Sequence, residues 1–283
     1  MSKLLLRKIE NEEFCNLTLD SNNLHKQNYF YNLKTPTNSI AVGMRSFALS
    51  IIQDLEAQYF FKKSTKNIYI PFNTMVTVGE EIIFNSSIYN KNKSNLILST
   101  TNSKNEELFQ EKDSKLVLSS IFEEISNNQI NNPNISNSTI YLPTNNKILE
   151  SFASNIYSKN NNLSQFIFSM VYSSGALQEL LKQNPKTSLE KELKDKIRKN
   201  ILPAYKTLKF SLASGIQKII SGKDLEYQIS LEKLNKREYL TNITCLQDRN
   251  KLFDAEYQIM MISEETILRK FKKEEKILNK LFS

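Results

Sequence analysis

Two carboxylates stand inside one of the most apolar stretches of the chain, and they are the first candidates for chemistry. Asp54 and Glu56 occur in the segment SFALSIIQDLEAQYFF, in which most other residues are hydrophobic. A carboxylate there must either face solvent or be buried, and burial raises its pKa toward that of a useful general base. We favour the solvent-facing position and keep both residues as candidate bases.

The chain has a single histidine, His25, in a polar N-terminal segment ahead of that apolar stretch. A lone histidine in such a segment is most often solvated surface, so we expect no catalytic role for it. The sequence also lacks GxSxG, Walker A, dinucleotide-binding glycine, HExxH and CxxC patterns. Its two cysteines, Cys15 and Cys245, have neither metal-ligand nor disulfide spacing. We therefore expect no metal and no cofactor.

Two apolar helices are expected to position the candidate residues. Residues 39–61 are apolar on nearly every face, which predicts a long buried helix, and residues 163–182 predict a second one. Each is followed by runs of alternating apolar and polar residues, the pattern of half-buried antiparallel strands. The strands expected in the second half are Leu208 to Ala213, Leu225 to Leu231, Tyr239 to Leu246 and Ala255 to Ile262. In the first half, strands are expected from Asn67 to Phe72 and within residues 76–118, with one or two edge strands near the N-terminus.

The two halves align with each other in sequence. Gly79 to Phe84 matches Gly222 to Tyr227 at an offset of 143 residues (79 to 222). Leu108-Phe109 matches Leu252-Phe253 at an offset of 144 residues (108 to 252). Because each matched set also follows an apolar helix, we interpret the chain as an internal duplication.

This pattern resembles the hotdog fold, and the likeness covers roughly residues 40–118 and 150–262. It is closest to the dehydratase and thioesterase families that act on acyl groups carried by acyl carrier protein or coenzyme A. The duplicated layout is also similar to that of AfsA-like proteins, although their Glu-x-x-Arg-Gln helix motif is not recognisable here. The resemblance implies an α+β fold of two hotdog repeats, each a long buried helix wrapped by an antiparallel sheet, packed as an intramolecular pseudo-dimer.

The resemblance also implies roles for residues of the first helix. Hotdog dehydratases use a histidine as base and a glutamate or aspartate as acid, and their pattern of His, Pro-Gly and Glu is absent. Hotdog thioesterases need one carboxylate and an amide at the helix N-terminus that polarises the thioester carbonyl. Asp54 or Glu56 would then be the base, the amides of Gly43 and Met44 the oxyanion donors, and Arg45 a phosphate or carbonyl contact.

The second helix offers fewer candidates. It has no acidic residue before Glu179, and its polar residues in the region of interest are Gln165, Ser169 and Tyr172. These side chains could hydrogen-bond a thioester or pantetheine amide but would be weak bases. The alternative, which we favour, is that they are satisfied inside a helix pair.

The net charge of +8 is unevenly distributed. Residues 151–283 hold 23 basic and 15 acidic residues, whereas residues 1–150 hold 15 of each. A basic half suits an acidic partner such as acyl carrier protein or a coenzyme A thioester. The alternative is that the basic residues form a bland solvated surface. Nucleic acid is not expected, because the lysines are interspersed with glutamates and aspartates. The stripe of apolar residues in the tail predicts a basic amphipathic helix, docked on the sheet or binding a membrane surface or partner helix.

The predicted organisation is a first repeat over 1–124, an Asn/Ser-rich linker over 125–147, a second repeat over 148–263 with a helical insertion at 185–200, and the amphipathic helix over 264–283. The insertion should be capped by Thr187 or Ser188. The predicted function is acyl-thioester processing in fatty-acid or secondary lipid metabolism, by hydrolysis or acyl transfer rather than dehydration. The alternative is a catalytically degenerate protein that binds an acyl chain or a protein partner. We expect a cytoplasmic protein, either a monomer that is itself a pseudo-dimer or a homodimer.

Overall fold

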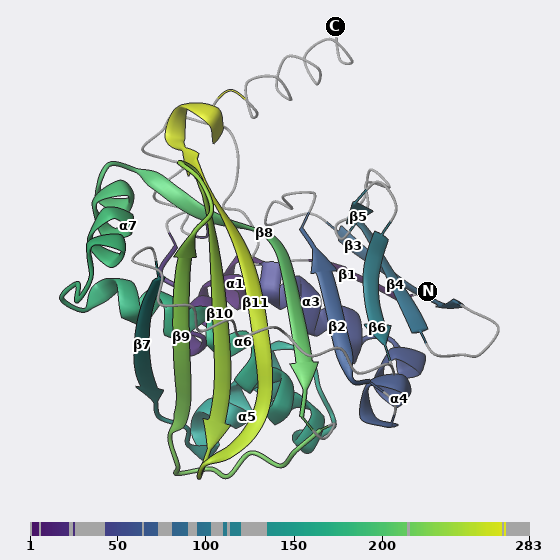
Figure 1. Cartoon of the computed structure of the whole chain (residues 1–283). Coiled ribbons are helices and arrows are strands. Elements are labelled where there is room, and N and C mark those ends of the chain that lie inside the picture. The colour runs from purple at the N-terminus through teal and green to yellow at the C-terminus, as the bar shows by residue number, and fades with distance from the viewer. Residues whose placement is uncertain are drawn as a thin grey trace, which may run out of the picture.

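The computed structural model describes most of the chain as one curved antiparallel sheet with helices against its inner face (Figure 1). The residues described are 2–5, 7–22, 25, 43–63, 65–72, 81–89, 95–102, 110–111, 114–119, 135–213, 216–267 and 269. The predicted match at Leu108-Phe109 and most of the predicted C-terminal helix lie outside this part of the chain. Residues 264–267 are helical, as the start of that helix requires.

The strands fall into two sets of similar order. The first set is β1 (Ser2–Leu5), β2 (Asn67–Pro71), β3 (Glu81–Tyr89), β4 (Asn95–Asn102), β5 (Gln110–Glu111) and β6 (Ser114–Ser119). The second set is β7 (Ile135–Leu142), β8 (Ile201–Leu212), β9 (Leu225–Lys233), β10 (Glu238–Gln247) and β11 (Asn250–Ser263). The alternation predicted for the second half is confirmed, since β10 alternates half-buried and buried residues along its whole length.

The order of the strands across the sheet is palindromic. It runs β1-β3-β4-β6-β2 and then β8-β11-β10-β9-β7, so each strand of the first repeat except β5, which lies off this path and pairs with β6, has a counterpart at the mirrored place in the second. The repeats join through the antiparallel pair β2 and β8, where Ile68 lies opposite Phe210 and Ile70 opposite Leu208. This arrangement fits the internal duplication inferred from the sequence, and it turns the inner edges of both sheets into one continuous ladder.

The helices follow the same duplicated plan. They are α1 (Lys8–Leu17), α3 (Gly43–Ile52) and α4 (Leu55–Lys63) in the first repeat, and α5 (Asn146–Asn155), α6 (Asn161–Lys182) and α7 (Ser188–Arg198) in the second. The prediction for α6 is confirmed, and Asn160 caps it by accepting a hydrogen bond from the Leu163 amide. The polar helix predicted within 185–200 is present as α7, with Thr187 as its N-cap, and its status as an insertion stays a prediction.

Of the one or two edge strands expected near the N-terminus, one is present as β1, and the residues that follow it form the helix α1. Two other expectations differ from the local structure. The long helix over 39–61 is interrupted after Ile52, because Asp54 caps a new helix. The linker contains the strand β7, which pairs with β9 along its full length.

The core lies between the helices and the sheet and is rich in aromatic rings. Helix α6 is buried on nearly every face, as expected for a helix enclosed by a sheet. The rings of Phe14 in α1 and Phe152 in α5 pack at a centroid distance of 5.7 Å, which joins the two repeats on the helical side.

Candidate active site

The two predicted bases lie at the junction between α3 and α4. Asp54 is half-buried, and its Oδ1 accepts a hydrogen bond of 2.8 Å from the Ala57 amide. That contact gives Asp54 a structural task as the N-cap of α4. Glu56 is exposed in the first turn of the same helix. A catalytic role for either carboxylate stays a prediction.

Gly43 begins α3, where the sequence placed the oxyanion donors, and buried Met44 follows it. A Cβ on Gly43 would lie 2.8 Å from the ring of Phe72, so the ring can occupy its position only because residue 43 has no side chain. The Phe72 ring in turn packs against Tyr205 of β8 at 6.0 Å. The role of the Gly43 and Met44 amides as oxyanion donors stays a prediction.

Arg45 is fully buried and is occupied by contacts within the protein. Its guanidinium donates to Glu10 Oε2 at 2.9 Å and to Asn155 Oδ1 at 3.0 Å. Tyr157 donates to the other oxygen of Glu10. Burial works to lower the pKa of Arg45, and the carboxylate of Glu10 opposes that effect. In this arrangement Arg45 ties α3 of the first repeat to α1 and α5, while its Nη1 has no hydrogen-bond partner among the described residues. The predicted contact of Arg45 with a phosphate or carbonyl group stays a prediction.

The polar residues predicted on α6 face the protein interior to different degrees. The Ser169 hydroxyl donates to the Phe166 carbonyl, and the Ser169 carbonyl accepts a bond of 2.8 Å from Tyr227. Burial raises the pKa of Tyr172 to about 12, with Glu179 as a smaller cause. Gln165 is half-buried. Ser169 is thus satisfied within the fold, and substrate binding by the three residues stays a prediction.

The structure brings together an acid–base pair that the sequence reading missed. The Nε2 atom of His25 lies 3.6 Å from Oδ2 of Asp20, and the two side chains are only 11 % and 3 % exposed. The expectation of a solvated histidine is therefore wrong. A buried imidazole beside a carboxylate is a common arrangement for moving a proton.

A tight polar turn holds the pair in place. Asp20 Oδ1 accepts a bond of 3.0 Å from the Asn22 amide, and the His25 amide donates to the Asn22 carbonyl. The Asn22 side chain donates to the Pro203 carbonyl on β8 at 2.9 Å. Leu19 has a φ of 57°, which reverses the chain after α1 and directs Asp20 inward. The turn is thereby anchored to the second repeat.

Helix α6 and strand β8 of the second repeat complete the surroundings of the pair. The Thr18 carbonyl packs so closely on Gly175 that a Cβ there would lie 2.0 Å from it. Ser21 donates to Gln178 at 3.4 Å, one turn further along α6. Burial raises the pKa of Tyr205 well above its usual value, with the charge of Asp20 as the second cause. The site therefore combines a turn from one repeat with a helix and a strand from the other.

The sequence contained one signal for this site, a short turn-forming run, which predicts the local turn but not its burial. Asp20, Asn22 and His25 lie in the run DSNNLH, whose short polar residues form turns in which the aspartate side chain bonds the backbone. Such a turn can aim two functional side chains at one point. The polar composition of this segment indicated an exposed loop. The turn is instead held by α6 and β8, whose contacting residues lie more than 150 positions further along the chain.

Within the described residues no group of three or more His, Cys, Asp or Glu side chains is placed to hold a metal ion. The same part of the chain has no helix of the length and apolarity needed to cross a membrane.

The two repeats, with helices enclosed by a shared sheet, define a double hotdog fold of the α+β class. Comparison with solved structures finds a MaoC-like dehydratase with a TM-score of 0.59 and 10 % identity, covering 92 % of this chain and 96 % of that one. A double-hotdog protein from Mycobacterium tuberculosis matches with a TM-score of 0.56 and 8 % identity, over 92 % of this chain and 94 % of that one. The peroxisomal multifunctional enzyme type 2 of Drosophila melanogaster matches with a TM-score of 0.50 and 10 % identity, over 91 % of this chain and 48 % of that one.

No protein-family model matches the sequence, and no curated protein matches it significantly. The structural likenesses, at 10 % identity or less, identify the fold.

Proposed function

We propose that this protein catalyses the reversible dehydration of a 3-hydroxyacyl thioester, with His25 and Asp20 as its acid–base pair. The observation that carries the proposal is the buried contact between these two side chains at 3.6 Å. The pair lies in a double hotdog fold, and one of the proteins similar in structure is a MaoC-like dehydratase. The sequence favoured hydrolysis or acyl transfer because it lacks the His, Pro-Gly and Glu pattern and because His25 was expected in solvent. The burial of His25 beside Asp20 changes the reaction that we propose.

The proposed reaction needs two proton transfers. In the dehydration direction, one member of the pair removes the proton from C2 of the acyl group, and the electron pair forms the C2–C3 double bond. The hydroxyl on C3 leaves with its bonding electrons, and a proton supplied by the other member makes it water. The reverse sequence hydrates a 2-enoyl thioester. An N–H at the start of α3, at Gly43 or Met44, would stabilise the negative charge that develops on the thioester oxygen.

The distance within the pair is compatible with this role. At 3.6 Å it exceeds a good hydrogen bond, and catalytic contacts in ligand-free sites are often long and tighten when substrate binds. The anchors of the turn on Pro203 and Gln178 keep both side chains near their working positions. The carrier of the acyl group is either coenzyme A or acyl carrier protein.

The test is a hydration assay with crotonyl-coenzyme A on the wild type and on Asp20→Asn, His25→Gln, Asp54→Asn and Glu56→Gln. We expect the first two variants to lose about 10²–10⁴-fold in kcat/KM. Asp224→Asn removes an exposed carboxylate at the far end of β9 and is the matched control. Circular dichroism verifies that each variant is folded.

Two outcomes would contradict the proposal. Loss of thioester turnover in Asp54→Asn or Glu56→Gln, with the Asp20 and His25 variants active, would favour the base predicted from the sequence. Absence of turnover in the wild type, together with saturable retention of an acyl chain, would favour a catalytically degenerate binding protein.

A further inference from the structure

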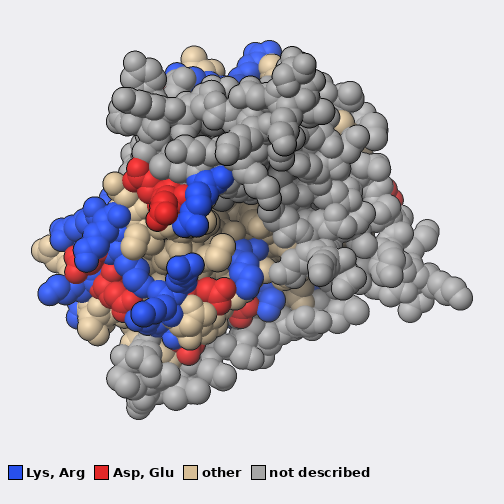
Figure 2. All heavy atoms as spheres, turned by 90° about the horizontal axis from the view of Figure 1, so that it is seen from above, with Lys and Arg blue, Asp and Glu red and all other residues tan. Residues whose placement is uncertain are grey.

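One end of the sheet carries much of the net charge of the chain. Residues 186–199, Lys206 and residues 233–238, here called the upper basic surface, contain ten basic and four acidic residues, a net charge of +6 out of +8. They comprise α7 with its flanks, the turn between β9 and β10, and an exposed lysine on β8. Figure 2 shows lysine and arginine side chains on the described part of this face, with aspartate and glutamate side chains among them.

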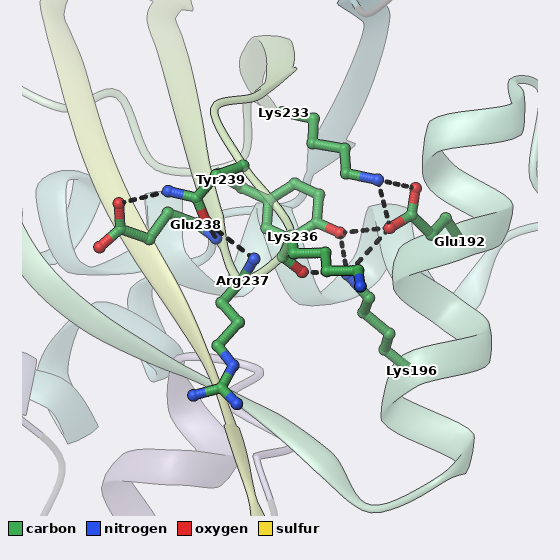
Figure 3. A network of polar contacts seen from close by, with 8 residues as sticks. Glu192, Lys196, Lys233, Lys236, Arg237, Glu238 and Tyr239 are labelled. Atoms are coloured by element: carbon green, nitrogen blue, oxygen red, sulfur yellow. Dashed lines mark hydrogen bonds and ion pairs between the residues drawn. The ribbon is translucent and has the colours of Figure 1, made fainter.

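The acidic residues of this surface are engaged within the protein. Lys233 donates to both oxygens of Glu192 at 2.8 and 2.7 Å, and Lys196 pairs with the same carboxylate at 2.9 Å (Figure 3). Glu190 accepts hydrogen bonds from Ser136 and Ser138 on β7. The charged groups of this surface that remain free to face solvent are therefore mainly lysines and arginines.

The turn between β9 and β10 is rigid and presents two of these cations. Asn235 accepts hydrogen bonds from the amides of Arg237 and Glu238, and Lys196 of α7 donates to the Lys236 carbonyl at 2.8 Å. Lys236 and Arg237 are exposed, and neither side chain has an acidic partner among the described residues. In Figure 3 the Arg237 guanidinium points away from the network. The two cations are therefore held in place by the backbone while their charges stay available.

The upper basic surface adjoins the turn that carries the acid–base pair. The Arg237 carbonyl accepts a bond of 2.7 Å from the Met261 amide, and Met261 lies opposite Pro203 in the sheet. Pro203 holds the side chain of Asn22. Arg237 is thus two strand spacings, about 10 Å, from the anchor of the site.

The extent of the surface favours a protein over a small molecule or a nucleic acid. Helix α7 alone has 11 residues and spans about 16 Å, far more than one phosphate group covers. Phosphate-binding surfaces on nucleic-acid proteins follow a continuous basic stripe, whereas here Glu192, Asp195 and Glu238 interrupt the lysines. A net positive helix and turn, whose Glu192 and Glu238 carboxylates are paired with lysines of the same surface, complements the negative side chains of an acidic helix.

We propose that the upper basic surface docks a small acidic carrier protein that delivers the thioester, with Lys236 and Arg237 as its main contacts. This inference rests on the proposed function, because it assigns the surface to the substrate of that reaction. The carrier would place its acyl arm beside β8, next to the turn of Asp20 and His25.

The experiment compares crotonyl-acyl carrier protein with crotonyl-coenzyme A as substrates of the full-length chain. The variant is Lys236→Glu/Arg237→Glu, and the control is Lys218→Glu, an exposed lysine between β8 and β9 at the other end of the sheet. We expect the double variant to lose about 30-fold or more in kcat/KM with the carrier protein at low ionic strength, and the loss to shrink as salt is added. With crotonyl-coenzyme A its kcat/KM should stay within about threefold of the wild type.

Other outcomes in the two assays overturn one of the two proposals, and the binding measurement separates them. An equal loss with both substrates would show that the surface serves coenzyme A or the fold, and no loss with the carrier protein would exclude docking there. If the wild type hydrates neither substrate, the proposed function fails, and anisotropy of fluorescently labelled holo-acyl carrier protein then tests docking by itself. Binding weakened by the double variant and not by Lys218→Glu supports the docking surface, and absent or unchanged binding rejects it.

Discussion

Asp20 and Ser158 occupy equivalent positions in the two repeats. Each follows a short helix and a residue with positive φ, Leu19 at 57° before Asp20 and Tyr157 at 56° before Ser158. The Asp20 amide donates to the Cys15 carbonyl, and the Ser158 amide donates to the Ala153 carbonyl. Donor and acceptor of the second repeat each lie 138 residues after their counterparts in the first repeat (20 to 158, 15 to 153).

The turn that follows is also preserved, although its chemistry is not. Asp20 accepts a hydrogen bond from the Asn22 amide at 3.0 Å, and the Ser158 hydroxyl accepts one from the Asn160 amide at 3.2 Å. At the same offset, the counterpart of His25 is Leu163 (25 to 163), which is buried in α6. Backbone geometry was therefore retained in the second repeat while the acid–base pair was present only in the first.

A carboxylate alone should not create a second site at Ser158. In the variant Asp20→Asn/Ser158→Asp, we expect kcat/KM to stay within about threefold of that of Asp20→Asn, because Leu163 cannot exchange a proton. Hydration of crotonyl-coenzyme A is the measurement. Recovery to within tenfold of the wild type would show that the second repeat retains a working site.

The pair of Glu10 and Arg45 should respond asymmetrically to mutation. Glu10→Ala leaves the fully buried guanidinium of Arg45 without its charge partner, which we expect to lower the free energy of unfolding by about 3–5 kcal/mol. Arg45→Met leaves Glu10, which is 14 % exposed and keeps Tyr157 as a donor, so its cost should be smaller, about 1–2 kcal/mol. Urea denaturation measures both.

The exposed ion pair of Lys8 and Glu12, on helix α1 like Glu10, provides the control for the effect of burial on stability. Its atoms are 3.8 Å apart and both side chains are largely solvated, so Glu12→Ala should change stability by less than about 0.5 kcal/mol. An Arg45→Met variant less stable than Glu10→Ala would show that packing of the arginine stem, and not burial of its charge, governs this cluster.

Glu192 should stabilise the protein only above acidic pH. Burial acts to raise the pKa of Glu192, but hydrogen bonds from Lys196, Lys233 and Tyr239 outweigh it and lower the pKa to about 2. Since the folded-state pKa is below the unfolded value of about 4.5, the stabilisation is complete above that value and disappears as the pH falls toward 2. The side chain is 35 % exposed, so we expect only about 1 kcal/mol.

Urea denaturation of the wild type and Glu192→Gln at pH 7, 5 and 3 tests this expectation. The difference between them should be constant from pH 7 to 5 and smaller at pH 3. Glu150→Gln, at an exposed position on α5, should differ little from the wild type throughout. A difference for Glu192→Gln that is unchanged at pH 3 would assign the effect to lost packing.

The strands with clean alternation could be predicted from sequence, and those with polar residues turned inward could not. In β10, buried Tyr239, Thr241 and Ile243 alternate with half-buried neighbours, and this period of two allowed the strand to be predicted from the sequence. In β7 the inward residues Ser136 and Ser138 are polar and bind Glu190, so ISNSTIYL looked like part of a linker. A hydrogen bond to a distant helix replaces the hydrophobic signal.

The contact between Asp20 and His25 could not be predicted from the sequence for a similar reason. The apolar run around Asp54 gave the carboxylate apparent importance, yet that residue caps α4. His25 appeared solvated because its neighbours in sequence are polar, and the groups that enclose its turn come from α6 and β8. Local composition predicts helices and strands well, but it contains no information on which distant element covers a loop.

The close approach of Gly175 to Thr18 provides a test of how the second repeat positions the site. In Gly175→Ala the new Cβ would lie 2.0 Å from the Thr18 carbonyl, so the turn that carries Asp20 must move away from α6. Overpacking of this kind costs about 1–3 kcal/mol, and displacement of the acid–base pair should lower kcat/KM for crotonyl-coenzyme A hydration at least tenfold.

Gly222→Ala is the matched control. Gly222 has a φ of 84° and open space around its Cβ position, so alanine strains the backbone by about 1 kcal/mol far from the site. If both variants are folded and equally active, α6 supports the fold without positioning the acid–base pair; if only Gly175→Ala loses activity, the helix of one repeat sets the geometry of the site carried by the other.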